Sequence, residues 1–366
     1  MTGVSFVVPV HNGGAHLAET LASIAAQADG RPMEVIVVED GSQDGSAALL
    51  RSLAAVYSLT VINGPRRGAA AAMNAGVRLA RHPIICQVDQ DVVLERGWMA
   101  ALVDALDDPS VAAAQGCYTT DAEGSFFARV MGMDLEQRYG RLGAYPDHVC
   151  TGNTAYRAAA LHEVGLFDHS LGYGYDNDLS YRLQAAGYRL TFCRNARSRH
   201  RWREGLSGYL EQQYGFGYGR LDVVARHPER YRGDAVSPPG MMGHPLVTGA
   251  AVGLVAADRI ALTLWGRTFG LLSVGVVLLL ALAAERAVAG VRAWRQFEDP
   301  AALAFPLVHF ARNIAWVTAA LMWTGRRLLG RPVKPAHSMT ARSAAMTTRT
   351  GRRRRGLPDS RESPAA

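Results

Sequence analysis

The stretch PIICQVDQDV, residues 83–92, decides how this chain folds, because an apolar run ends there in two acids. The run has the length and composition of a buried strand. Asp89 and Asp91 are two residues apart, and alternate residues of an extended segment face the same side. Ligands of open α/β folds bind at the carboxyl ends of the strands. We therefore expect both carboxylates to point into a binding site.

The chain before this stretch alternates between apolar runs and helical patterns. The expected strands are residues 4–10, 34–39, 59–62 and 83–88, and the expected helices are residues 15–28, 44–56 and 68–80. Strands that alternate with helices imply parallel crossover connections. The predicted fold class is therefore α/β, with a mostly parallel sheet flanked by helices.

Beyond Asp91 the pattern is less regular. We expect helices at residues 96–106, 123–139, 157–164 and 177–186, and strands at residues 111–116, 148–151 and 188–192. Glycine and tyrosine interleave at residues 172–175 and 214–219. This composition indicates loops that cover a ligand.

The last third of the chain is markedly apolar. Hydrophobic residues make up 49% of the whole chain and charged residues only 19%. Residues 239–257 and 268–284 lack formal charge, and each stretch is near the length that a bilayer demands. Two interpretations stay open, a pair of transmembrane helices or a helical hairpin lying in or against the membrane. A third stretch, 301–324, contains His309 and Arg312 and is more typical of an interfacial helix.

The net charge of +7 could suggest a nucleic-acid partner, but its distribution argues against one. Much of the excess follows the apolar segments, at residues 326–331 and 352–355. Basic residues in that position are typical of the cytoplasmic side of a membrane. We predict membrane binding and no nucleic-acid binding.

These patterns divide the chain into three parts. We expect an α/β domain at 1–235, membrane-associated helices at 236–330 and a basic, disordered tail at 331–366. Met1 to Gly3 leads directly into the first strand without the pattern of a signal peptide, so we expect the first domain to face the cytoplasm at the cell membrane. Reduced thiols are expected for the four widely spaced cysteines, Cys86, Cys117, Cys150 and Cys193.

Two acidic segments carry the expected chemistry. The carboxylates of Asp89 and Asp91 are hard oxygen ligands that suit Mg²⁺ or Mn²⁺, which usually complete their shell with substrate phosphate. The segment VEDGSQDGS, residues 38–46, ends the second strand, where an acid can accept hydrogen bonds from a nucleobase or ribose. Asp44 and Ser46 fit turn and cap positions. The glycine-rich motifs of dinucleotide oxidoreductases and P-loop NTPases are absent.

Together these segments resemble the family 2 glycosyltransferases of the GT-A fold. The matching segments, in the family's order, are VVPVHN (7–12), VEDGSQDGS (38–46), Gly68 with NAG (74–76), VDQDV (88–92), TGN (151–153) and GYDNDLSYRLQAAGYRL (174–190). The match covers almost all of the first 200 residues. The resemblance implies a Rossmann-like domain that transfers a sugar from a nucleotide-diphosphate donor with the help of Mn²⁺ or Mg²⁺.

The resemblance also implies roles for individual residues. Donor binding falls to Pro9, Asp40, Asn74 and Asp89, and metal binding to Asp89 and Asp91. His200 follows the last strand, where some GT-A enzymes supply a third metal ligand. Arg220 lies in a segment similar to the family's post-catalytic segment and could counter the donor diphosphate.

The catalytic base implied by the resemblance is Asp176. The family often has Glu-Asp here, and this chain has Tyr175 in place of the Glu. Asp178 is the alternative base, although its place at the start of a helix also suits a stabilising N-terminal charge. A base that activates an acceptor hydroxyl for one displacement inverts the anomeric configuration.

Two other functions stay open, a noncatalytic membrane-anchored protein that binds sugar nucleotides and a sugar-phosphate nucleotidyltransferase. Residues 8–14 lack the glycine-rich loop with Arg and Lys that is usual for the second class. Gln212 and Gln213 are not followed by the Arg-Trp pair of processive polysaccharide synthases, which favours addition of single sugars. The apolar segments suggest a lipid-linked or envelope acceptor.

Overall fold

The computed structural model describes residues 1–330, and an eight-stranded sheet organises the part up to His200. The strand order across the sheet is β3-β2-β1-β4-β7-β6-β8-β5. The strands are β1 (Val4–Val10), β2 (Met33–Glu39), β3 (Thr60–Asn63), β4 (Ile84–Val88), β5 (Val92–Leu94), β6 (Val111–Thr119), β7 (Asn153–Arg157) and β8 (Arg189–His200). Across the sheet, β3, β2, β1 and β4 pair in parallel. β7 is antiparallel to both β4 and β6, and β8 is parallel to β6. The predicted α/β fold is confirmed.

Helices cover both faces of this sheet. They are α1 (Leu17–Ala25), α2 (Ser46–Tyr57), α3 (Ala69–Leu79), α4 (Trp98–Ala105), α5 (Phe126–Tyr139), α6 (Ala158–Glu163) and α7 (Tyr175–Ala185). Phe6 of β1 packs in a core with Leu21 of α1, whereas its neighbour Val7 packs in a second core with Met73 of α3. Because alternate residues of β1 enter different cores, this strand is apolar throughout.

The strand expected at residues 148–151 is wrong, and β7 begins only at Asn153. Side-chain oxygens, rather than a neighbouring strand, accept backbone N–H groups of this segment. The amide of Val149 donates to Ser180 Oγ at 3.1 Å, and the amide of Cys150 donates to Gln115 Oε1 at 2.8 Å. An apolar pattern alone does not show whether backbone groups pair with a neighbouring strand or with side chains.

The loop expected at residues 214–219 is also wrong, because this segment lies inside α8 (Gly205–Arg226). A Cβ at Gly215 or Gly219 would come within 2.3 or 2.5 Å of Tyr173 atoms. These two glycines, one helical turn apart, let α8 approach the start of α7 closely. The glycine and tyrosine pattern therefore reflects helix packing, which outweighs the helix-weakening effect of glycine.

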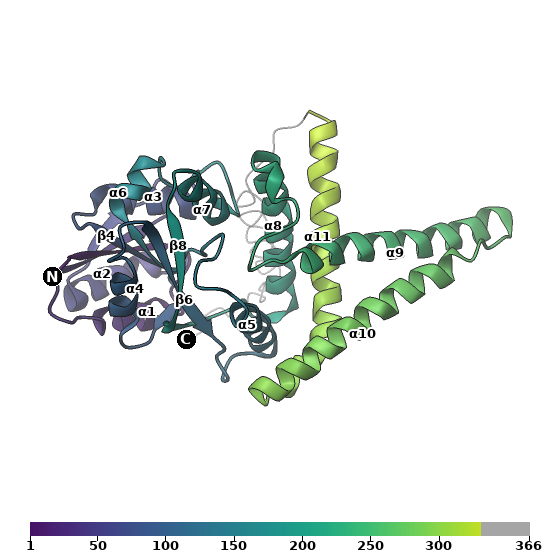
Figure 1. The fold of residues 1–366 in the computed structure, drawn as a ribbon, viewed down its shortest axis with the longest axis horizontal. Helices are drawn as coiled ribbons and strands as arrows, with labels where there is room; N and C mark the ends of the chain where they lie inside the picture. Colours follow the sequence, from purple (N-terminus) through teal and green to yellow (C-terminus); the bar gives the residue numbers. More distant parts are fainter. Residues whose placement is uncertain (331–366) are drawn as a thin grey trace, which may run out of the picture.

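Three longer helices follow a short 3₁₀ turn at Pro228–Arg230: α9 (Pro239–Trp265), α10 (Leu271–Phe297) and, after a second such turn at Pro300–Ala304, α11 (Phe305–Leu328). α11 lies along α8, where Trp323 Nε1 donates to Asp222 Oδ1 at 2.8 Å. Figure 1 shows α9 and α10 projecting beyond α11, away from the sheet. The α/β domain thus contacts the C-terminal helices mainly through α8 and α5.

Both projecting helices are long and apolar enough to cross a membrane. α9 and α10 each have 27 residues and contain 18-residue stretches with mean hydropathies of 1.5 and 2.1. Large apolar side chains, including Trp265 and Phe269 near their connecting turn, are exposed. Of the residues that the structure describes, only these two helices meet that test, and α11 does not. The predicted basic tail lies outside the described residues.

Candidate active site

The acidic motif after β4 lies beside the end of the last strand. β5 pairs antiparallel with β8, which places Val92 opposite His200. His200 Nε2 consequently lies 3.7 Å from Asp91 Oδ1. One ligand atom each from Asp89, Asp91 and His200 lie within 4.8 Å of one another. The three-residue strand β5, which the sequence pattern did not reveal, thus assembles the three predicted metal ligands.

The electrostatics of this group fit a divalent cation. Burial, followed by the like charge of Asp91, raises the pKa of Asp89 to about 7, although Gln87 Nε2 donates to Asp89 Oδ1 at 2.8 Å. Burial also lowers the pKa of His200, so its ring is neutral at neutral pH and offers a lone pair. Two crowded carboxylates beside a neutral imidazole form a donor set that suits Mn²⁺ or Mg²⁺.

Asp176 lies in the first turn of α7, directly after Gly174 and Tyr175. Gly174 has φ of 76°, a conformation that glycine adopts without strain and that turns the chain into the helix. Burial raises the pKa of Asp176, and the positive charge of His148 opposes this rise. A partly buried carboxylate with a raised pKa is suited to general base catalysis.

Asp178, the alternative base, is instead bound by a guanidinium and an imidazole. Its Oδ2 lies 2.8 Å from Arg182 Nε and its Oδ1 lies 2.9 Å from His227 Nε2. Its side chain is buried, and it does not belong to the described residues that line the cavity beside Asp176. The geometry therefore favours Asp176 as the reactive carboxylate of α7.

A single cavity of about 400 Å³ is lined both by the acids of the predicted metal site and by the predicted base. Its wall includes the predicted metal ligands and the predicted base, Asp89, Asp91, His200 and Asp176. Other parts of the wall come from α5, α8 and α11, which contribute Arg138, Gln213, His309, Arg312 and Trp316. The cavity thus extends from the end of the sheet to the helices that adjoin α9 and α10.

Asp40 lies at the same edge of the sheet, at the carboxyl end of β2. Its carboxylate accepts hydrogen bonds from the amides of Arg66 at 2.5 Å and Gly68 at 3.0 Å. His11 links it to the acidic motif, because His11 Nδ1 lies 3.1 Å from Asp40 O and the His11 amide donates to Gln90 Oε1 at 2.8 Å. The ends of β1, β2 and β4 are therefore tied together.

The other two residues predicted on the donor side are less accessible. Pro9 lies within β1, in register with Val38 of β2. Asn74 of α3 uses both ends of its amide on one residue: its Nδ2 donates to Phe167 O at 2.8 Å and its Oδ1 accepts from Phe167 N at 3.0 Å. Within the described part of the chain, the residues lining the cavity do not include Pro9, Asp40 or Asn74.

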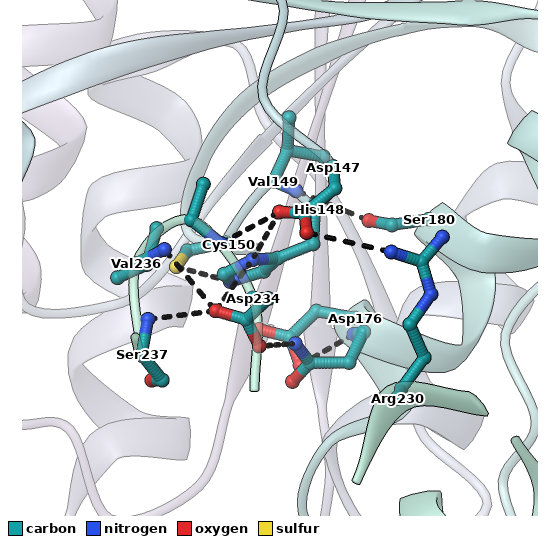
Figure 2. Close-up of polar contacts among 12 residues, drawn as sticks. Asp147, His148, Val149, Cys150, Asp176, Ser180, Arg230, Asp234, Val236 and Ser237 are labelled. Atoms are coloured by element: carbon teal, nitrogen blue, oxygen red, sulfur yellow. Dashed lines mark hydrogen bonds and ion pairs between the residues drawn. The ribbon is translucent and has the colours of Figure 1, made fainter. Parts of the chain in front are cut away.

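Arg220 does line the cavity, but its guanidinium is paired within the protein. Its Nη1 donates to Asp234 Oδ2 at 2.7 Å and its Nη2 donates to Arg230 O at 3.0 Å. Figure 2 shows Asp234 next to His148. Both residues line the cavity, and neither was predicted from the sequence. His148 and Asp234 are far apart in the sequence and belong to none of the motifs that we recognised, so only the folded chain reveals them.

Comparison with known proteins agrees with this arrangement. The model of the family described as "Glycosyl transferase family 2" matches residues 5–165. The chain is 29% identical over 270 residues to a pre-mycofactocin glycosyltransferase of Mycobacterium tuberculosis, covering 70% of this chain but only 55% of that relative. It is 25% identical over 228 residues to glycosyltransferase AglE of Haloferax volcanii, covering 60% of this chain and 73% of AglE.

A solved structure shows the same fold. The mannosyltransferase PcManGT of Pyrobaculum calidifontis, in complex with GDP-Man and Mn²⁺, is similar with a TM-score of 0.56 at 20% identity, over 88% of this chain and 86% of that one. The sequence matches, the GT-A-like sheet and the acidic cavity at its edge agree with one another. Together the family match over residues 5–165, the relatives named as glycosyltransferases and the GT-A-like fold support a glycosyltransferase of family 2.

Proposed function

We propose that this chain moves a sugar from a nucleotide-diphosphate donor to an acceptor hydroxyl, with inversion at the anomeric carbon. The observation that carries the proposal is that Asp176 and the group Asp89, Asp91 and His200 line one cavity. A base for the acceptor and a binding site for the leaving diphosphate must lie on either side of the same anomeric carbon. One cavity with both groups meets this requirement.

In this mechanism Asp176 takes the proton of the acceptor hydroxyl as its oxygen attacks the anomeric carbon. The bond from that carbon to the diphosphate oxygen breaks in the same step, and the nucleoside diphosphate leaves with the electron pair. Attack opposite to the leaving group inverts the configuration. Asp178 keeps α7 in place through its pairs with Arg182 and His227.

Asp89, Asp91 and His200 would hold a divalent cation, Mn²⁺ or Mg²⁺. Such an ion supplies positive charge for the oxygen of the departing diphosphate. Burial and the like charge of Asp91 raise the pKa of Asp89 to about 7, which supports this role because a bound cation would favour the ionised carboxylate. The PcManGT complex with Mn²⁺ is consistent with the same choice of metal.

We place the donor nucleoside at the ends of β1 and β2, beside Pro9 and Asp40. The bonds from His11 to Asp40 and to Gln90 join this edge to the acidic motif, so a diphosphate could extend from one to the other. Asn74 supports this region through Phe167, and Arg220 acts through Asp234, so neither has to touch the donor.

The acceptor is proposed to reach Asp176 from the side of α11, and to be lipid-linked or an envelope glycan. The cavity wall includes Arg312 and Trp316 of α11, next to the two helices that are able to cross a membrane. Basic residues at the end of α11, Arg326 and Arg327, suit the cytoplasmic side of the membrane. We therefore place the catalytic domain at the cytoplasmic face.

Replacing the proposed base tests the mechanism most directly. Asp176→Asn should lower kcat by about 10³-fold, because the amide cannot accept the acceptor's proton. Donor binding, measured by calorimetry, should persist. The matched control is Asp178→Asn, two residues along the same helix, which should lower thermal stability and leave kcat of the folded enzyme within a few-fold. Equal turnover in Asp176→Asn and the wild type would refute the base assignment.

A donor screen separates the other functions. UDP-, GDP- and dTDP-sugars are incubated with the full-length, detergent-solubilised protein, with and without Mn²⁺. Release of a nucleoside diphosphate supports sugar transfer, release of pyrophosphate from a sugar phosphate and a nucleoside triphosphate would indicate a nucleotidyltransferase, and binding without turnover would indicate a noncatalytic sugar-nucleotide-binding protein.

A further inference from the structure

A second group of two acids and a histidine is formed by Asp147, His148 and Asp234, and its members His148 and Asp234 line the same cavity. His148 Nδ1 lies 3.4 Å from Asp234 Oδ1 and 4.0 Å from Asp147 Oδ1, and Cys150 Sγ lies 3.7 Å from His148 Nε2. The side chains of His148 and Asp234 are 5% and 1% exposed. Figure 2 shows the imidazole between the two carboxylates.

Donors inside the protein already occupy the oxygens of Asp234. Its Oδ1 accepts from the amides of Val236 at 3.1 Å and Ser237 at 2.7 Å, and its Oδ2 accepts from Arg220 Nη1 at 2.7 Å. Arg230 Nη1 similarly lies 3.4 Å from Asp147 Oδ2. Because two guanidinium groups adjoin these acids, a metal ion would have to displace them. The group is a protein-only charge network.

This network is joined to α7 at the residues that surround Asp176. Asn177 bridges the two, since its amide donates to Asp176 Oδ1 at 3.0 Å and its Nδ2 donates to Asp234 Oδ2 at 3.4 Å. One turn later, Ser180 Oγ accepts the amide of Val149, the residue after His148. Asp176 and His148 are therefore held in place relative to each other from two sides.

The charge of His148 is the part of this network that favours an ionised Asp176. The charged and titratable groups around the pair are Asp89 from the end of β4, Asp147 and Cys150 from the segment before β7, Tyr156 from β7, Tyr175 and Asp178 from α7, Arg220 from α8, and Arg230 and Asp234 from the chain after α8. Asp234 and Asp89 each repel a negative charge on Asp176, whereas His148 attracts it. Arg220 and Arg230 are turned to Asp234 and Asp147.

We propose that His148 is a positioning residue of the transfer reaction, whose imidazolium, held by Asp234 and Arg220, keeps the neighbouring Asp176 ionised so that it can accept a proton. This inference rests on the proposed function of the site. It assigns a role to His148 and Asp234, which lie outside the family motifs, and a positioning role to Arg220. His148 supplies the charge, Asp234 keeps that charge in place, and Arg220 anchors Asp234 from α8.

The directions of the pKa shifts of both groups agree with the geometry. Burial alone would lower the pKa of His148, but the carboxylate of Asp234 and the contact with Cys150 raise it to about 10. His148 is therefore a cation throughout the neutral range. Burial raises the pKa of Asp176, and His148 counteracts that rise. Without the cation, Asp176 would stay protonated to a higher pH.

The test is the pH profile of kcat for His148→Gln, measured with full-length enzyme and the sugar nucleotide that the donor screen identifies. A general base works only when deprotonated, so transfer falls as the pH drops through its pKa. Removing the cation should move this acid limb upward by about one pH unit and slow transfer about tenfold at a fixed pH on the limb. The donor KM should change little. If His148→Gln does not fold, the smaller neutral His148→Asn provides the same measurement.

The matched control is His227→Gln, which removes the other histidine paired with an acid of α7. His227 binds Asp178 and is not among the described residues lining the cavity. It should lower thermal stability and leave the acid limb unchanged. A folded His148→Gln enzyme with the wild-type limb, or a limb that moves equally in both variants, would overturn the proposal. If wild type transfers no sugar at all, the proposed function itself fails.

Discussion

Two groups in this molecule have the same composition, two aspartates and a histidine, and very different surroundings. In both, one ligand atom from each residue lies within 4.8 Å of the others. In Asp89, Asp91 and His200 the acids crowd each other, and the neutral ring lies 3.7 Å from Asp91, beyond hydrogen-bond distance. In Asp147, His148 and Asp234, amides and guanidinium groups satisfy the acids and the histidine is charged.

The difference shows that residue types do not determine what a cluster does. The donors supplied by the rest of the fold decide it. The negative charges of Asp89 and Asp91 are not neutralised by a guanidinium and can attract a metal ion. Those of Asp234 and Asp147 are already neutralised by Arg220 and Arg230. The first group should therefore be needed for activity and cost stability, and the second should be needed for stability and for tuning the base.

The largest expected effect is the loss of activity in Asp91→Ala. Removing this carboxylate should lower transfer by about 10³-fold, because the charge on the departing diphosphate is no longer stabilised. The melting temperature should stay the same or rise, since repulsion of Asp89 is relieved. The residual activity should no longer respond to added Mn²⁺ or to chelator.

The control for this variant is Asp147→Asn in the second group. Asp147 is partly exposed and neighbours Arg230, so its loss should leave the response to Mn²⁺ and chelator unchanged. Full activity of wild-type enzyme in excess chelator would contradict a metal at the first group.

The next effect in size is the destabilisation expected for Asp234→Asn. A neutral amide leaves Arg220 and His148 without their buried counter-charge, which should lower the free energy of unfolding by about 3 kcal/mol. Chemical denaturation at several pH values measures this difference. Because the folded pKa of His148 is raised to about 10, its share of the advantage should be complete below about pH 6.5 and vanish as the pH rises to about 10.

A contrary result would show which of the two groups binds the metal ion. If Asp234→Asn is as stable as the wild type but no longer responds to Mn²⁺, the second group, and not the first, binds the metal. A destabilised variant whose activity responds to Mn²⁺ as before would strengthen the distinction between the two groups.

Much of the fold could be predicted from the sequence because the spacing of apolar residues and the positions of turn residues are local features. The first four strands and the helices between them follow directly from apolar runs and turn residues. The errors arose where tertiary contacts decide the structure. The glycines of α8 that leave room for Tyr173 led to the prediction of a loop. The segment at Cys150, whose amide is bonded by a side chain, led to the prediction of a strand.

The candidate site was predictable only where a motif lies next to a strand or helix end. Asp89 and Asp91 were predicted in this way, His200 and Asp176 were predicted with the help of the family resemblance, and all four line one cavity. His148 and Asp234 could not be recognised, because their pairing depends on the chain after α8 folding back onto the segment before β7. Arg220 was noticed, but its partner Asp234 could not be inferred from spacing.

The smallest expected effect is that of His200→Gln, and it tests the first group most finely. Losing one of three ligands should raise the Mn²⁺ concentration needed for half-maximal activity by about 10-fold, while saturating Mn²⁺ restores most of kcat. The control is His227→Gln, which should need as much Mn²⁺ as the wild type because His227 is occupied by Asp178. If His200→Gln also keeps the wild-type requirement, the two aspartates hold the ion without the histidine. The short pairing of β5 with β8 would then serve to seal the end of the cavity rather than to complete a metal site.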